Sequence, residues 1–175
     1  ERSGTNARDL DGDEIGARAA RKALESANQV AVEPGEWTVI LEPAAFGELA
    51  WFLAPHFSAQ SYDEGSSFLS GRLGERVMGA NVTIRDDYAH PLHPDQPFDW
   101  EGTPKQRVAP IEGGVARTLV TDATWARRLG RANIGHALPA PNPDGPYPLD
   151  RVVAPGTESV AALIALEPDP DQAVI

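Results

Sequence analysis

The chain contains no cysteine among its 175 residues. Disulfide bridges, thiolate zinc sites and cysteine nucleophiles are therefore excluded, which is typical of proteins from a reducing compartment. No apolar run approaches the roughly 20 residues that cross a bilayer, and the start Glu1-Arg2-Ser3-Gly4 has no apolar signal region. These absences predict a cytoplasmic protein without a membrane partner.

Basic residues are scarce, because 15 Lys and Arg stand against 26 Asp and Glu, giving a net charge of −11. Nucleic-acid binding requires a concentrated basic surface, so no nucleic-acid partner is expected. The apolar fraction of 41% and the charged fraction of 23% are typical of a folded protein. The 16 Gly and 16 Pro predict many turns and argue against an all-helical bundle.

We expect a single domain over residues 1–175, because no linker or composition shift marks a boundary. Residues 1–8 and the acidic, proline-punctuated residues 167–175 are expected to be frayed.

The N-terminal part predicts two helices and one strand. Acidic residues precede basic ones over Asp9–Asn28, and apolar residues recur there at helical spacing, so this segment is expected to be helical. The run Trp37–Leu41 predicts a buried strand. Pro43 then opens an apolar helix that continues over Ala44–Ala54. The polar residues 60–79 predict a loop with a short helix.

A β-hairpin is the clearest local prediction. Two apolar segments within residues 106–120 flank Gly113-Gly114, which supplies the positive φ that a tight turn needs. Pro110 in the first arm indicates an edge position or a bulge.

Further strands are predicted at Asn81–Asp86 and Arg151–Ala154, and a helix capped by Thr121-Asp122 should end at Gly130. Residues 159–166 are compatible with a strand or a helix. Together these elements predict an α+β fold with a mixed, largely antiparallel β-sheet and a few short helices.

Several polar residues are candidates for chemistry. His90 and His93 could share a metal ion with oxygen ligands from nearby aspartates, namely Asp86, Asp87, Asp95 and Asp99. Such a loop is equally consistent with a solvated surface. His136 is compatible with a structural hydrogen bond or with a base near neutral pH.

Asp99 and Glu101 would project to one side of an extended backbone. Paired carboxylates can act as acid and base or hold a cation, and a surface turn accounts for them as well. No serine-hydrolase elbow and no phosphate-binding glycine loop is present.

Several strings in order along the chain resemble the TldD/TldE family, also called PmbA or modulator of DNA gyrase. They are Val32-Glu33-Pro34-Gly35-Glu36-Trp37 through Leu41-Glu42-Pro43, Ser67-Phe68-Leu69 with Arg72-Leu73-Gly74-Glu75, Phe98-Asp99-Trp100-Glu101-Gly102-Thr103-Pro104, Ile111-Glu112-Gly113-Gly114-Val115, Ala126-Arg127-Arg128-Leu129-Gly130 and Gly135-His136-Ala137. The resemblance covers the central part of the family chain and implies the TldD/PmbA fold of its middle or C-terminal domain. It leaves open whether the sequence is a piece of a longer protein or a naturally short relative.

The resemblance implies a subunit of a two-component zinc metallopeptidase that acts on peptides. In TldD-type subunits a His-Glu-x-x-x-His helix holds zinc and activates water. Here Pro43, Ala44 and Glu48 stand at those three positions. The chain therefore resembles the TldE (PmbA) type, with no catalytic residue, no metal ligand and no cofactor of its own, and with zinc expected in a TldD-like partner.

The same resemblance suggests five residues that face the partner or the peptide: Glu48, Arg72, Asp99, Glu101 and His136. Two alternatives stay open, a stand-alone metal-dependent enzyme that uses His90 and His93, and a binding or scaffold module without chemistry. Trp51 and Phe52 are expected in the core, although an exposed apolar patch there would favour an interface.

Overall fold

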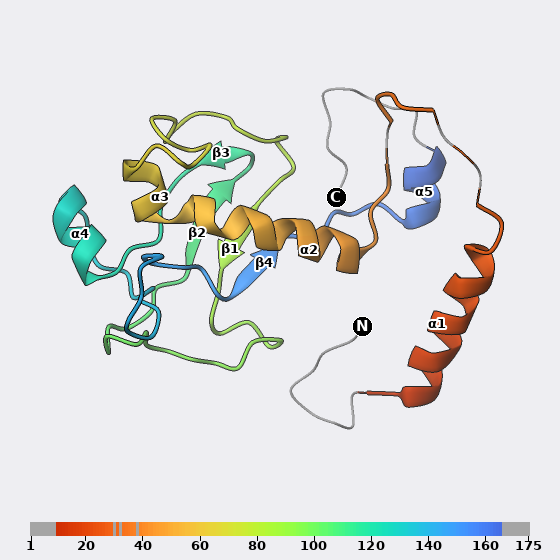
Figure 1. Ribbon diagram of the computed structural model, residues 1–175, viewed down its shortest axis with the longest axis horizontal. Coiled ribbons are helices and arrows are strands. Elements are labelled where there is room, and N and C mark those ends of the chain that lie inside the picture. The colour runs from red at the N-terminus through yellow and green to blue at the C-terminus, as the bar shows by residue number, and fades with distance from the viewer. Residues whose placement is uncertain (1–9, 30, 32, 38, 166–175) are drawn as a thin grey trace. The chain divides into compact units, whose positions relative to one another are not determined.

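A computed structural model describes residues 10–29, 31, 33–37 and 39–165 (Figure 1). By their internal contacts these residues fall into two units, 1–39 and 40–175, which are described separately below. Among the described residues, no helix has both the length and the apolar character needed to cross a membrane.

Helix α1, Gly12–Glu25, is the regular element of the first unit. Asp11 caps it, since its Oδ1 accepts hydrogen bonds from the backbone N–H groups of Asp13 and Glu14 at 3.0 and 3.1 Å. Acidic residues lie in the first turn and Lys22 in the last, in the order that the helix dipole favours. The helix predicted at Asp9–Asn28 is confirmed over this range, while Asp9 lies outside the described residues.

The strand predicted at Trp37–Leu41 is wrong for its described residues, because residues 37 and 39–41 have no strand geometry. The Trp37 indole instead donates to the backbone oxygen of Glu33 at 3.1 Å, across the Pro34-Gly35 turn. A β-branched and aromatic run becomes a strand only where another strand pairs with it, which composition alone does not reveal.

The second unit contains an antiparallel sheet in the order β3-β2-β1-β4. Its strands are β1 (Ile84–Asp86), β2 (Val108–Glu112), β3 (Val115–Ala116) and β4 (Arg151–Val153). The predicted hairpin is confirmed as β2 and β3. Pro110 lies on the inner strand β2 where the pairing with β1 shifts register, so the bulge alternative is the one observed.

Short helices complete this unit (Figure 1). Helix α2, Pro43–Leu53, confirms the predicted apolar helix and is followed directly by the short 3-10 helix η2, Ala54–Phe57. The others are α3 (Ala59–Asp63), α4 (Ala123–Leu129) and α5 (Val160–Ala165). Helix α4 has the predicted Asp122 cap and ends at Gly130, with φ of 63°, and α5 shows that residues 159–166 contain a helix rather than a strand.

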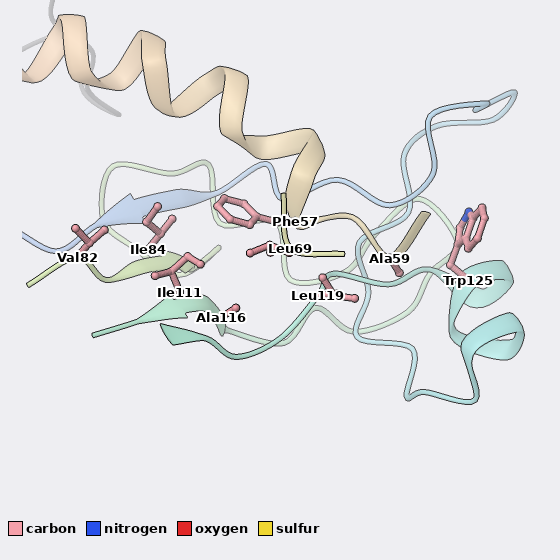
Figure 2. Packing of buried hydrophobic residues seen from close by; sticks show 9 residues of the cluster. All are labelled: Phe57, Ala59, Leu69, Val82, Ile84, Ile111, Ala116, Leu119 and Trp125. Carbon is pink, nitrogen blue, oxygen red and sulfur yellow. The ribbon is translucent and has the colours of Figure 1, made fainter. Parts of the chain in front are cut away.

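The hydrophobic core joins the sheet to the segment that follows α2. Figure 2 shows Ile84 and Ile111 on neighbouring strands, close to Phe57 and Leu69. These four side chains are almost completely buried. Leu53, at the end of α2, also packs against this cluster, so the sheet positions the C-terminal end of the helix.

Trp51 and Phe52 do not belong to the core, contrary to expectation. They are 56% and 68% exposed, and Ala50 is the buried residue of α2. The helix therefore presents large apolar side chains on its surface, a feature that usually marks an interface.

We predict that Gly114→Ala lowers the free energy of unfolding by about 3 kcal/mol, measured by urea denaturation. Gly114 has a φ of 75°, and an added Cβ would lie 2.5 Å from the backbone oxygen of Gly79. Gly113→Ala is the matched control, since that residue also has a positive φ of 54° but its Cβ would meet nothing closer than 3.6 Å. It should cost only about 1–2 kcal/mol. Equal losses would contradict the close packing of the turn on residues 78–79.

Candidate functional site

Four charged or titratable side chains are buried together beside the sheet. We call them the buried ion cluster, and they are Asp86, Lys105, His136 and Asp150. His136 Nε2 lies 3.1 Å from Asp86 Oδ1, and the backbone N–H of Asp150 donates to Asp86 Oδ2 at 2.9 Å. Lys105 Nζ donates to Asp150 Oδ2. Each buried charge thus has a partner, as the cost of removing charges from water requires.

His136 is held by its backbone as well as by its ring. Its N–H donates to the backbone oxygen of Thr121 at 3.1 Å, and its own oxygen accepts from Tyr147 N–H at 2.9 Å. The ring Nδ1 is buried, and none of the residues that the structure describes offers it a hydrogen bond. Because the residue is 1% exposed, its ring cannot meet a substrate in this arrangement, and it orders the segments around it.

One local pattern predicts the burial of a residue of this cluster. Alternate residues of a strand face the same side, so Asp86 shares the face of the buried Ile84 and is expected to be buried with it. Sequence reasoning considered Asp86 only as a metal ligand and missed Lys105 and Asp150. The cluster joins residues 45 to 64 positions apart, a separation that no local pattern reports.

His90 and His93 lie next to each other, with ring centroids 5.7 Å apart. His93 Nδ1 is 3.7 Å from Asp150 Oδ1, and His90 Nδ1 accepts a hydrogen bond from Leu92 N–H at 3.3 Å. Among the described residues, no group of three or more His, Cys, Asp or Glu side chains is placed to hold a metal ion. The metal-enzyme alternative therefore has no geometric support in that part of the chain.

Asp99 and Glu101 lie on a turn rather than on a strand, so they do not form a carboxylate pair. Asp99 is 3% exposed and accepts from the N–H groups of Glu101, Thr103 and Ala137 at 2.9–3.0 Å. Glu101 is exposed and accepts from the N–H of Ala123, at the start of α4. Asp99 thereby fixes the residue next to His136, and Glu101 caps a helix.

The other two expected site residues lie on exposed segments. Glu48 is on the exposed part of α2, and Arg72 pairs with Glu75 at 3.1 Å with both side chains about half exposed. Within the described part of the chain, no hydrogen bond or ion pair links either of them to Asp99, Glu101 or His136. The structure thus brings Asp99 and His136 together but leaves Glu48 and Arg72 apart from them.

A surface groove of about 550 Å³ lies between η2, α3 and the proline-rich loop of residues 138–149. Its apolar lining comes from Trp51, Pro55, Leu138, Pro143, Tyr147 and Leu149. No local pattern in the sequence predicts the contact of Tyr147 with Trp51, because it joins segments far apart in the sequence.

Arg151 connects the two aromatic rings of the groove. Its guanidinium carbon lies 5.1 Å from the Trp51 ring centroid and 5.6 Å from that of Tyr147, and the two rings are 6.0 Å apart. Burial raises the pKa of Tyr147 against the opposing attraction of Arg151. Burial also lowers the pKa of Arg151, while Tyr147, Asp86 and Asp150 oppose this change.

We predict that Asp86→Ala lowers the free energy of unfolding by about 3 kcal/mol, because it leaves His136 and the Asp150 N–H without their buried acceptor. Asp87→Ala, the adjacent residue, is the matched control. Its carboxylate lies 3.9 Å from an Arg107 side chain that is 65% exposed and accepts the exposed N–H of Ala89 at 3.2 Å, so its loss should cost no more than about 1 kcal/mol. Urea unfolding monitored by tryptophan fluorescence measures both, and similar losses would contradict the role of the cluster.

The family model of the PmbA/TldA metallopeptidase C-terminal domain matches residues 34–168. An uncharacterized protein of Methanocaldococcus jannaschii is 35% identical over 131 residues, covering 73% of this chain and 31% of that protein. A protein of Archaeoglobus fulgidus named as a metalloprotease is 31% identical over 104 residues, covering 59% of this chain and 24% of its own length.

Two solved structures are also similar to this chain. A Thermotoga maritima protein described as a modulator of a DNA gyrase has a TM-score of 0.85 at 30% identity, over 92% of this chain and 37% of its own. TldE from Thermococcus kodakarensis has a TM-score of 0.57 at 26% identity, over 66% of this chain and 27% of its own. The chain thus spans only 24–37% of the length of these four relatives. The predicted α+β fold with an antiparallel sheet and short helices is confirmed, and the chain belongs to the PmbA/TldD metallopeptidase family.

Proposed function

We propose that the chain is the non-catalytic subunit of a two-component zinc metallopeptidase, and that a TldD-like partner carries the zinc. One observation supports this most strongly. Helix α2 has Pro43, Ala44 and Glu48 where the resemblance places His, Glu and His. This chain has the helix, but the three positions lack the two histidines and the glutamate that a zinc site of this kind requires.

The residues of α2 do not fit a zinc ion. Neither the Pro43 ring nor the Ala44 methyl group has an atom that can bind a metal or move a proton. Ala44 and Glu48 are four residues apart and therefore share one side of the helix. Glu48 could supply one oxygen, but a catalytic zinc site needs three protein ligands. We therefore derive no catalytic step on this chain and assign the chemistry that zinc supplies, activation of water, to the partner.

The exposed apolar residues of α2 support a role in assembly. Leu49, Trp51 and Phe52 are 54%, 56% and 68% exposed, although most residues of these types are buried in a folded protein. A helix with such a surface favours a chain that binds a partner over a solitary enzyme. We propose that this helix contacts the TldD-like subunit.

The five suggested site residues divide by their exposure. Glu48, Arg72 and Glu101 are exposed and are proposed to face the partner or the peptide. Asp99 and His136 are buried, so we propose that they act as positioning residues that hold the loops around residues 99–103 and 136–147.

We expect the isolated chain to contain no stoichiometric zinc and to cleave no peptide, because α2 lacks the ligands and the base. Purification of the tagged chain from its native cell, followed by mass spectrometry and zinc analysis, should recover a zinc-containing partner with a His-Glu-x-x-x-His helix. Inhibition by a zinc chelator is the control for contaminating proteases. Zinc-dependent peptide cleavage by the isolated chain would contradict the proposal.

We predict that Phe52→Glu weakens binding of the partner by about tenfold or more, since a buried interface aromatic contributes strongly to affinity. Leu92→Glu, at a residue that is 66% exposed on a different segment, is the control and should change affinity less than about threefold. Biolayer interferometry measures the affinity, and urea unfolding should show that both variants are folded. Equal binding by the two variants would place the interface elsewhere.

A further inference from the structure

We propose that the groove between η2, α3 and the proline-rich loop binds an extended peptide through a Lys or Arg side chain. The choice of a peptide as occupant rests on the proposed function, whereas the choice of a basic side chain rests on the groove itself. No residue of the metal-site resemblance lies in this groove.

The charged residues that line the groove are of one sign, whereas the Arg151 guanidinium, which contacts the Trp51 and Tyr147 rings, is not part of the lining. Glu64 on the α3 side and Asp144 on the loop side are exposed acidic residues of its lining, and the lining contains no Lys, Arg or His. Glu64 Oε1 accepts from the neutral Gln60 Nε2 at 3.1 Å, and no ion pair within the described ranges compensates the charge of Glu64. Among the described residues, no hydrogen bond or ion pair is made by the side-chain carboxylate of Asp144. Two carboxylates in one lining favour a cationic ligand in the groove.

The aromatic wall favours the same ligand. Trp51 and Tyr147 line the groove, and both rings already lie within cation–π distance of the Arg151 guanidinium. An aromatic ring attracts cations to its faces, so a Lys or Arg side chain can pack its methylene groups on Trp51 while its charged end reaches a carboxylate. Leu138 and Leu149 provide apolar contact for neighbouring residues of the peptide.

The two walls are fixed to each other. Gln60 Nε2 donates to the backbone oxygen of Pro143 at 3.2 Å, which ties α3 to the loop. Gly145 has a φ of 70°, and an added Cβ would lie 2.9 Å from Gln60 Cβ, so the loop approaches α3 as closely as glycine permits. The groove is therefore formed before a ligand arrives, which lowers the entropic cost of binding. Its volume of about 550 Å³ is in the range of ligand sites.

Fluorescence anisotropy with the full chain and short labelled peptides tests the proposal. The peptides are unstructured, capped at both ends and identical except that two lysines are replaced by glutamines. The lysine peptide should bind at least about tenfold more tightly than the glutamine peptide. The double variant Glu64→Gln/Asp144→Asn should lose this preference and leave binding of the glutamine peptide unchanged.

The control variant Glu36→Gln/Glu158→Gln removes the same two charges from exposed residues outside the groove. It should change the affinity for the lysine peptide less than twofold. An equal loss in both variants would overturn the proposal, because it would reveal only the attraction of a chain with a net charge of −11 for cations. Absence of a lysine preference in the unmodified chain would overturn it as well.

A second measurement locates the peptide. The chain has four tryptophans, and the indole N–H signal of Trp51 can be assigned from its loss in Trp51→Phe. Addition of the lysine peptide should shift this signal and leave that of Trp37 unchanged. A shift confined to other tryptophans would overturn the site. Neither assay includes the partner, so the two proposals can fail separately. If the chain binds no lysine peptide but still captures the zinc-containing partner, peptide binding in the groove is refuted and the proposed function is not.

Discussion

The carboxylate of Asp86 carries a charge inside the second unit, and the segments of the candidate site are arranged around it. One oxygen of this carboxylate contacts the His136 ring, and the other accepts the N–H of Asp150, which precedes strand β4. Lys105 compensates the neighbouring Asp150. A buried carboxylate is tolerated only where its partners are in place. The pairing of β1 with β4, the loop at His136 and the segment at Lys105 therefore depend on one another.

The buried ion cluster also positions residues that line the groove. His136 accepts the N–H of Tyr147 through its backbone oxygen, and Tyr147 contacts Arg151 and Trp51. The buried ion cluster thus leads by direct contacts to the aromatic wall of the groove. Helix α2 contributes Trp51 to that wall, and the same helix has replaced the zinc-binding residues that the family resemblance places on it. A helix without metal ligands can thus still shape the surfaces that we propose for peptide and partner.

Local patterns in the sequence predicted local structure well. The charge order of α1, the Asp122 cap of α4 and the Gly113-Gly114 turn depend on neighbouring residues, and the structure confirms them. Of the two alternatives open at Pro110, an edge position or a bulge, the structure shows the bulge. The strand expected at Trp37–Leu41 failed, because a strand needs a pairing partner, and the described residues of that run have none. The exposure of Trp51 and Phe52 was also missed, since an apolar composition does not say which side of a helix meets the core. Of the buried residues around the candidate site, Asp99 and His136 were singled out from the sequence, but as residues that face the partner or the peptide. Lys105, Asp150 and the groove depend on long-range contacts.

We propose that this chain supports a zinc peptidase without holding the metal. X-ray diffraction from crystals of the purified complex, recorded on both sides of the zinc absorption edge, locates the zinc ion. We expect an anomalous peak on the His-Glu-x-x-x-His helix of the partner and none near Pro43, Ala44 and Glu48 of this chain. A zinc peak coordinated by side chains of this chain alone would contradict it.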